Sequence, residues 1–330
     1  MKATSLFDRL IGRRRPVWLT LLVSLVLLSL PFLSVYLDGG LGEVTRRGEW
    51  RVLLLPPVII IYILLVTPMM MRMSERVLEA LRQLVPLEDA EFQHLVEHSA
   101  RLSPLSELVL VAVGFALGIL SALASGIDDQ YTWLRVYWFL CNGLMYALLA
   151  WTIYVSIAST RVNAAIHRQE LRFDILDQRP FDAVGRQSLL LALVFIGGIT
   201  LSLLLSFQPA SLAALDFWIG YLVLMAVVVL IFFLNMLPTH RLLAAEKTRA
   251  LAPVQGHINR LSRQLVSSLD RGQDTGELPG QISALTLYEA RLLGARTWPY
   301  NTAMLRTLFF SVLIPIGTLL IRLIFELLYG

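Results

Sequence analysis

Charged residues are scarce in this chain: only 16% of its 330 residues are Asp, Glu, Lys or Arg, and 56% are hydrophobic. Soluble domains carry about 25% charged residues, so the composition excludes an ordinary soluble protein. Runs of roughly 18 or more apolar residues can cross a bilayer. Seven such runs cover about residues 16–37, 52–71, 107–126, 133–158, 188–207, 214–237 and 302–328. The sequence therefore predicts an all-α integral membrane protein with seven transmembrane helices.

Several features of enzymes and secreted proteins are also missing. Cys141 is the single cysteine and lies inside the fourth run, so no intramolecular disulfide is possible. The chain contains no Gly-rich phosphate loop and no Ser-centred elbow. The first run is too long for a signal peptide and no cleavage site follows it, which predicts a signal anchor. We therefore expect no enzyme and no cofactor.

The distribution of positive charge predicts the orientation. Twenty-two of the 28 Lys and Arg residues lie in the N-terminal segment and in the second, fourth and sixth connections, whereas four lie in the other connections. Because cytoplasmic loops carry the excess of Lys and Arg, the N-terminus is expected in the cytoplasm and the C-terminus outside. This predicts a multi-pass protein of the cytoplasmic membrane, whose basic charge gives no argument for nucleic acid. The lipid bilayer is the expected partner.

The inward connections are long enough to fold. Residues 72–106, 159–187 and 238–300 are predicted to form cytoplasmic helical segments that pack as an anchor-like bundle within one domain of 330 residues. Ser74 is a candidate N-cap in the first segment. In the third segment, apolar residues have the spacing of a coiled coil: Val254, Ile258, Leu261, Leu265 and Leu269. A return helix over 282–292 is expected to complete a helical hairpin.

Two patterns within the apolar runs predict packing and anchoring. Small residues recur every four positions in the third run: Gly114, Gly118, Ala122 and Gly126. Helices approach closely along such a ladder, because association in lipid depends on packing. We expect the partner helix to belong to the same chain, with another subunit as the alternative. Trp and Tyr residues in and near the runs, including Trp18, Trp138 and Trp151, are expected to anchor the protein at the membrane interfaces.

The segment HLVEH at 94–98 matches the H-x-x-E-H zinc pattern. On a helix, His94 and His98 share one face, and Glu97 could polarise a bound water. No third ligand is evident in the sequence, and the surrounding connection is too short for a protease fold. The favoured interpretation is a solvated helix face without metal, and a zinc site is the alternative.

The last run carries charges and hydroxyl groups inside an otherwise apolar segment. At about 100° per residue, six polar or helix-breaking residues fall on one stripe: Thr307, Ser311, Pro315, Thr318, Arg322 and Glu326. An Arg at the bilayer centre costs roughly 2.5–3.5 kcal/mol, so the stripe is expected to meet protein or water. It is either a seam against the chain's own helices, with its two charges paired, or the wall of a pore made by several copies. In a pore, the hydroxyls replace hydration and the charges form rings at the outer mouth.

These observations leave three hypotheses about function. The first is an oligomeric ion channel or channel-like pore lined by the last helix, assembled as a closed homo-oligomer. The second is a membrane sensor or scaffold whose cytoplasmic coiled-coil helices bind a protein partner. The third is a small-solute transporter, although the deep ionisable residues that proton-coupled transporters use are nearly absent from the first six runs.

Three segments together carry a resemblance to a known family. They are RLLAAEKTRALAPVQGHINRLSRQLVSSLD (241–270), ISALTLYEARLLGARTWPY (282–300) and TAMLRTLFFSVLIPIGTLLIRLIFELL (302–328). Their layout is similar to the cytoplasmic anchor and last span of the seven-transmembrane ion-channel superfamily that includes insect odorant and gustatory receptors. The resemblance implies a cytoplasmic N-terminus, an outside C-terminus and a tetrameric pore lined by the last helix. The family's Thr-Tyr and Gln-Phe signature has no counterpart here.

Overall fold

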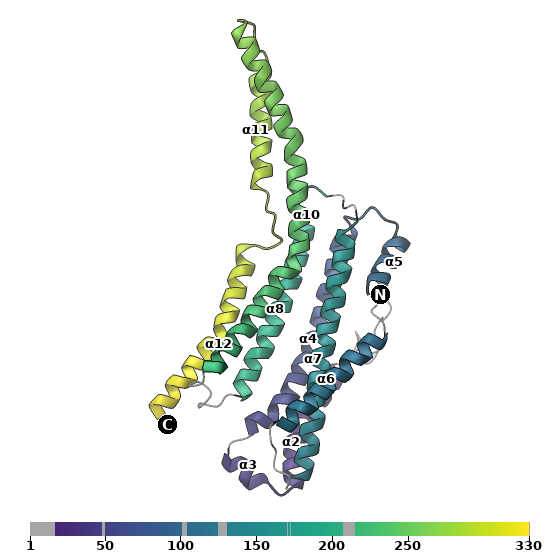
Figure 1. The fold of residues 1–330 in the computed structure, drawn as a ribbon, viewed down its shortest axis with the longest axis vertical. Helices are drawn as coiled ribbons and strands as arrows, with labels where there is room; N and C mark the ends of the chain where they lie inside the picture. The colour runs from purple at the N-terminus through teal and green to yellow at the C-terminus, as the bar shows by residue number, and fades with distance from the viewer. Residues whose placement is uncertain are drawn as a thin grey trace.

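The computed structural model describes residues 17–47, 50–100, 104–124, 131–169, 171, 173–206 and 215–329. Its helices are α2 (Val17–Leu37), α3 (Leu41–Arg47), α4 (Trp50–Arg82), α5 (Asp89–Ala100), α6 (Pro104–Ala124), α7 (Thr132–His167), α8 (Arg179–Ser206), α10 (Leu215–Asp270), α11 (Leu278–Gly294) and α12 (Thr302–Tyr329). No strand occurs in these residues, so the predicted all-α class is confirmed. Figure 1 shows most of the helices aligned along the long axis of the molecule.

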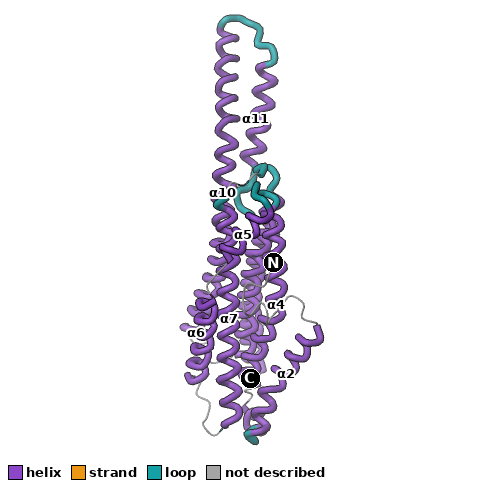
Figure 2. Tube along the Cα trace, turned by 90° about the vertical axis from the view of Figure 1, so that its right-hand side faces the viewer, coloured by secondary structure: helices purple, strands orange, loops and turns teal. Residues whose placement is uncertain are grey.

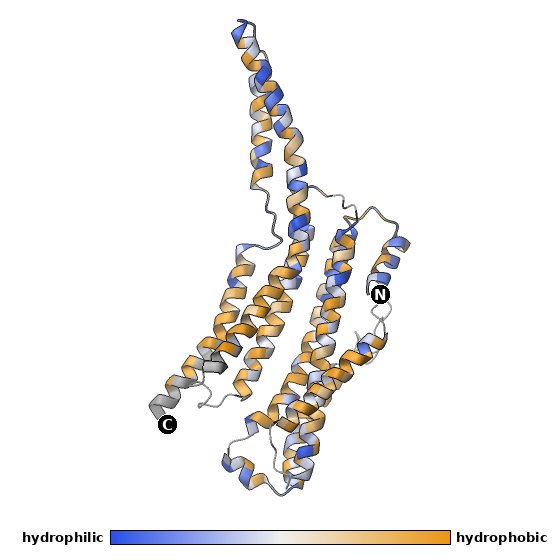
Figure 3. Cartoon of the chain, in the orientation of Figure 1, coloured by the Kyte–Doolittle hydropathy of each residue, from blue (hydrophilic) through white to orange (hydrophobic). Residues whose placement is uncertain are grey.

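Six of the described helices are long and apolar enough to cross a membrane: α2, α4, α6, α7, α8 and α10. Figure 3 shows that hydrophobic residues dominate this part of the molecule. Large apolar side chains on its outer surface, such as Leu25 and Leu105, are exposed, as expected for a surface that meets lipid. The fold is thus compatible with a multi-pass membrane protein. In α12 the described apolar part, Thr302–Gly317, is shorter than in these six helices.

Three helices are longer than a bilayer requires. α4 has 33 residues, α7 has 36 and α10 has 56, whereas about 20 residues cross the hydrocarbon core. At 1.5 Å per residue α10 is about 84 Å long, and it continues through Pro238 and Pro253. Ser74 lies within α4, so its prediction as an N-cap is wrong. The helix continues past Ser74 because residues 69–82 contain no Gly or Pro that would end it before Arg82.

The C-terminal part of α10 pairs with α11 in a helical hairpin that projects beyond every other described helix (Figures 1 and 2). We call residues 247–294 the stalk. Val254 and Leu292 are buried near its base, whereas Leu269 near its tip is 61% exposed. The stalk therefore rests on the bundle at one end and is open to solvent at the other.

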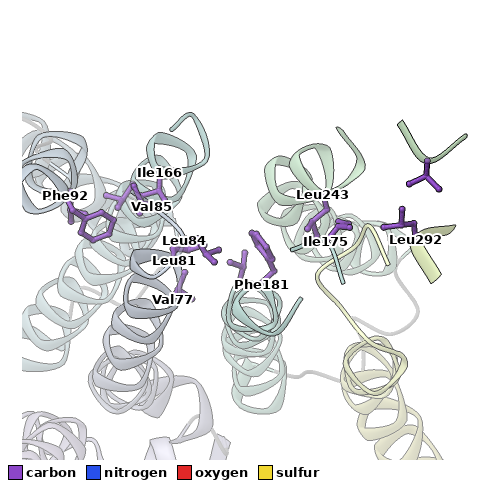
Figure 4. Packing of buried hydrophobic residues seen from close by; sticks show 14 residues of the cluster. Val77, Leu81, Leu84, Val85, Phe92, Ile166, Ile175, Phe181, Leu243 and Leu292 are labelled. Carbon is purple, nitrogen blue, oxygen red and sulfur yellow. The ribbon is translucent and has the colours of Figure 1, made fainter. Parts of the chain in front are cut away.

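A hydrophobic cluster holds the base of the stalk to the bundle. It includes Leu81 of α4, Ile166 of α7, Phe181 of α8 and Leu243 of α10, together with Leu292 of α11. Figure 4 shows these side chains in a row that crosses helices far apart in the sequence. Segments 72–106, 159–187 and 238–300 all contribute to this cluster. The base of the stalk is thus a packed layer in its own right.

Three further clusters fill the apolar part of the bundle. One joins α2, α3, α4, α6 and α7, a second lies mainly between α4 and α7, and the third joins α8, α10 and α12. Hydrogen bonds also cross between helices: the hydroxyl of Tyr62 on α4 donates to the carbonyl of Val194 on α8 at 2.8 Å. Because α12 packs with α8 and α10 in the third cluster, it belongs to the side of the bundle that carries the stalk.

Not every aromatic residue lies where an interfacial anchor would. Trp18 is 63% exposed, but Trp138 is buried and Trp151 is only 1% exposed. The indole nitrogen of Trp151 donates to the buried carboxylate of Glu107 at 3.3 Å. The expectation of anchoring is therefore wrong for Trp138 and Trp151. Both lie on the side of α7 that faces other helices, a position that the sequence alone does not reveal.

Candidate functional site: the junction between stalk and bundle

The segment that joins α11 to α12 is held by side chains from distant parts of the chain. α11 ends at Gly294 and α12 begins at Thr302. We call residues 295–301 the linker. Lys247 of α10 donates from Nζ to the carbonyls of Leu293 at 2.6 Å and Ala295 at 2.9 Å. The Nε2 of Gln178, just before α8, donates to the carbonyl of Arg296. The carbonyl groups at the end of α11 and the start of the linker are thus bound by side chains of α10 and of the segment before α8.

His240 of α10 fixes the centre of the linker. Its Nδ1 lies 3.1 Å from the carbonyl oxygen of Thr297. Because a carbonyl oxygen only accepts hydrogen bonds, Nδ1 is the protonated nitrogen of this contact. The His240 ring also stacks on Trp298, with centroids 4.0 Å apart and planes 10° apart. Trp298 in turn contacts Tyr300 and Phe233. One histidine therefore orders both the backbone and the aromatic side chains of the linker.

Close backbone packing fixes the end of the linker. A Cβ at Gly185 of α8 would overlap the carbonyl oxygen of Pro299, so this approach requires glycine. Asn301 then caps α12, because its Oδ1 accepts from the backbone N–H of Met304 at 2.9 Å. α12 is consequently placed by contacts at its first residues as well as by its packing on α8.

A network of polar side chains links the same level of the other helices. Ser74 of α4 and Ser159 of α7 lie 3.2 Å apart at their hydroxyls. The Nε2 of Gln187 on α8 donates to Ser159 at 2.9 Å, and Asn163 on α7 donates to the Oε1 of Gln187 at 3.2 Å. Such hydrogen bonds between helices average about 0.6 kcal/mol each in a membrane protein. Together they fix how α4, α7 and α8 lie relative to one another.

The network continues from α7 to α10 through a histidine. The Nδ1 of His167 lies 2.5 Å from the carbonyl of Asn163 and therefore donates to it. In the neutral ring, Nε2 is then the acceptor for the hydroxyl of Thr239 at 2.9 Å. Thr239 is only 1% exposed and precedes His240, which holds the linker. Polar contacts therefore run from α4 to the start of α12, and this junction is the candidate functional site.

The expected pore residues only partly share one environment. Thr307 is exposed, Ser311 is half-buried and Pro315 is buried. The hydroxyl of Thr307 donates to the backbone carbonyl of Ala303, and the hydroxyl of Ser311 donates to the backbone carbonyl of Thr307. Each acceptor lies four residues earlier in the same helix. In this single chain, these two hydroxyls are therefore satisfied within α12. The side chains of Thr318, Arg322 and Glu326 lie outside the described residues.

The small-residue ladder of α6 faces α7 of the same chain. A Cβ at Gly114 would collide with Ala150 and the carbonyl of Tyr146, and one at Gly118 with the carbonyl of Asn142. Ala122 is buried in a cluster with side chains of α7. Gly126 lies outside the described residues. The described part of the ladder is thus occupied by an intramolecular contact.

The HLVEH segment lies on the exposed side of α5. His94, Glu97 and His98 are all exposed, and the two imidazole rings stack with centroids 6.1 Å apart. Across the described residues, no group of three His, Cys, Asp or Glu side chains is placed to hold a metal ion. The arrangement therefore has the geometry of a solvated helix face.

Sequence reasoning did not identify the junction. Its members are ordinary Gln, Asn, Ser, Thr and His residues near the ends of apolar runs, without a motif or a fixed spacing. The contact between Gln178 and Arg296 joins residues 118 positions apart. The available signal was the TWPYN segment between two predicted helices, where two aromatics and a proline meet. No family model, curated protein or solved structure matches this chain.

Proposed function

We propose that this chain is a seven-span protein of the cytoplasmic membrane, with α12 as the seventh span, the N-terminus in the cytoplasm and the C-terminus outside. Its function is that of a membrane sensor or scaffold: the stalk binds a cytoplasmic protein, and the junction transmits that binding to the membrane helices. The uneven distribution of Lys and Arg supports the orientation, and the 28 residues of α12 are enough to cross a bilayer.

One observation carries the functional part of the proposal: both stalk helices are connected to helices of the bundle, α10 as one continuous helix and α11 through a linker that bundle side chains contact. α10 passes from bundle to stalk without a break. α11 returns through the linker, which is held by Lys247, Gln178 and His240. A force on the stalk therefore reaches α10 directly and α12 through seven restrained residues. A stalk that served only as a solvated extension would need none of these contacts.

Photo-crosslinking in cells tests the binding half of the proposal. A photoreactive amino acid is placed at Leu269, near the exposed tip, and in a matched variant at Leu230, an exposed residue in the apolar part of the same helix. We expect a discrete protein adduct from Leu269 that Leu230 does not give. Identical adducts from the two positions, or no adduct from Leu269 in a folded and expressed variant, would contradict the proposal.

A second candidate function is an ion channel formed by a cyclic homo-oligomer with α12 lining the pore. One observation favours it: α12 lies at an edge of the molecule (Figure 1) and leaves Ala303 and Thr307 exposed. Recordings from purified protein in planar bilayers test it. We expect unitary currents that Ser311→Leu reduces and that Phe309→Leu, on the exposed apolar side of α12, leaves unchanged. Silent bilayers with folded protein would count against the channel and leave the scaffold.

A further inference from the structure

Several arginines without carboxylate partners lie in the linker or within a few residues, along the chain, of side chains and backbone that contact it. Four of them are exposed: Arg186, Arg241, Arg296 and Arg306. Within the described part of the chain, none of the four forms an ion pair. Arg296 donates only to the carbonyl of Tyr300 at 3.4 Å, and Arg306 lies over the ring of Phe310 at 5.7 Å. Their positive charges therefore remain available to an external anion.

The four side chains come from three helices and the linker but belong to one level of the molecule. Arg186 directly follows Gly185, whose backbone packs on Pro299 of the linker. Arg241 directly follows His240, which stacks on Trp298. Arg296 is part of the linker itself, and Arg306 lies little more than one turn into α12. Folding thus gathers charges that the sequence separates by up to 120 positions.

The chain around the linker is poor in negative charge. Residues 290–325 contain four arginines, among them Arg296 and Arg306 of this cluster, and no Asp or Glu. The neighbouring carboxylates on α8 and α10, Asp182 and Glu246, are not paired with any of the four. The adjacent Trp298 and Tyr300 are residue types that gather at the level of lipid headgroups. An anion at this level of a membrane protein is most readily a lipid phosphate.

We propose that this arginine cluster binds the phosphate groups of anionic lipids in the leaflet that faces the stalk. Guanidinium groups bind phosphate oxygens with paired hydrogen bonds, and anionic leaflets attract basic segments next to a span. Lipid bound here lies against the linker, so the anionic lipid content of the membrane acts on the same joint as the stalk. The inference depends on the proposed placement of the stalk outside the bilayer, but it requires no protein partner.

Native mass spectrometry of the full chain in a neutral detergent tests the proposal, with phosphatidylglycerol and phosphatidylcholine as probes. We expect the parent to bind phosphatidylglycerol at least tenfold more tightly than phosphatidylcholine. Arg241→Gln combined with Arg296→Gln should weaken phosphatidylglycerol binding by roughly thirtyfold, since each basic residue contributes about 1 kcal/mol. The matched double variant Arg260→Gln and Arg263→Gln removes two exposed arginines from the stalk and should leave binding unchanged.

Three results would overturn the proposal: equal binding of the two lipids by the parent, an equal loss in the stalk variant, or displacement of phosphatidylglycerol by millimolar inorganic phosphate. The last result would identify a soluble phosphate, not a lipid, as the ligand. Arg241→Lys with Arg296→Lys keeps the charge but not the paired hydrogen bonds, and should bind phosphatidylglycerol more tightly than the Gln variant and more weakly than the parent, which separates a loss of charge from misfolding. Because no partner takes part, failure here leaves the test of stalk binding independent.

Discussion

Single residues decide how the helices of this protein meet. Thr239 is buried, and its hydroxyl donates a hydrogen bond to Nε2 of His167. The Nδ1 of His167 in turn donates to the backbone carbonyl of Asn163 on α7. Removing one partner from such a pair leaves a buried polar group without a hydrogen bond, which costs more than the bond itself contributes. The contact is small, but together with the hydrogen bond from Thr160 to Asn235 at 3.4 Å it connects α7 of this network to α10. Its loss should therefore be measurable.

Thr239→Val keeps the shape of the side chain and removes the hydroxyl, so the Nε2 of His167 loses its donor. We expect the free energy of unfolding to fall by about 1 kcal/mol, measured by reversible unfolding in mixed micelles. Thr248→Val on the same helix is the control, since the exposed Thr248 hydroxyl donates only to the carbonyl of Ala244. Its effect should stay within about 0.5 kcal/mol. Equal effects from the two variants would show that the network contributes nothing.

At the scale of elements, the linker is the part on which the proposed transmission depends. After α11, the linker contacts His240 of α10 and then Gly185 of α8. It ends at Asn301, whose side chain caps α12. Its hold on α8 is a backbone contact that tolerates no side chain. A methyl group at Gly185 should therefore loosen the linker without altering its sequence.

Gly185→Ala should push Pro299 away from α8 at a cost of roughly 1–3 kcal/mol, the range for overpacked sites. Hydrogen exchange of the backbone amides from residue 296 to residue 304 should become faster. Gly198→Ala, also in α8, is the control: the nearest atom to its new Cβ is a ring carbon of Tyr62 at 3.7 Å, an ordinary contact. Unchanged exchange in Gly185→Ala would mean that the linker is not held there.

The sequence predicted the elements better than their connections. Apolar runs located the membrane-type helices, because a bilayer imposes length and composition on them. The spacing of Val254, Ile258 and Leu261 pointed to the stalk helix. The burial of Trp151 and the hydrogen bond from His240 to the linker depend on which helices pack against each other. A pattern of residues along the sequence does not show which helices are neighbours. The prediction that Trp and Tyr residues anchor the protein at the membrane interfaces was therefore wrong for Trp138 and Trp151, which are surrounded by other helices and not by lipid.

At the scale of the whole molecule, stalk and bundle form one body with a packed layer between them. The cluster around Leu81, Phe181 and Leu292 joins six helices at the base of the stalk. The polar network and the linker lie next to this layer, and the four exposed arginines lie in the linker or close along the chain to its contacts. The stalk, the proposed lipid site and α12 therefore meet at one level of the molecule. The proposed binding of a cytoplasmic protein by the stalk requires that level to be the cytoplasmic membrane surface.

Labelling with a membrane-impermeant maleimide tests this placement most directly. In a Cys141→Ser background, Leu41→Cys places a thiol in α3, at the end of the molecule opposite the stalk, and Leu269→Cys places one near the stalk tip; both positions are exposed. We expect intact cells to label Leu41→Cys, and Leu269→Cys to be labelled only after the membrane is permeabilised. Labelling of Leu269→Cys in intact cells, with Leu41→Cys protected, would place the stalk outside the cell and rule out its binding of a cytoplasmic protein.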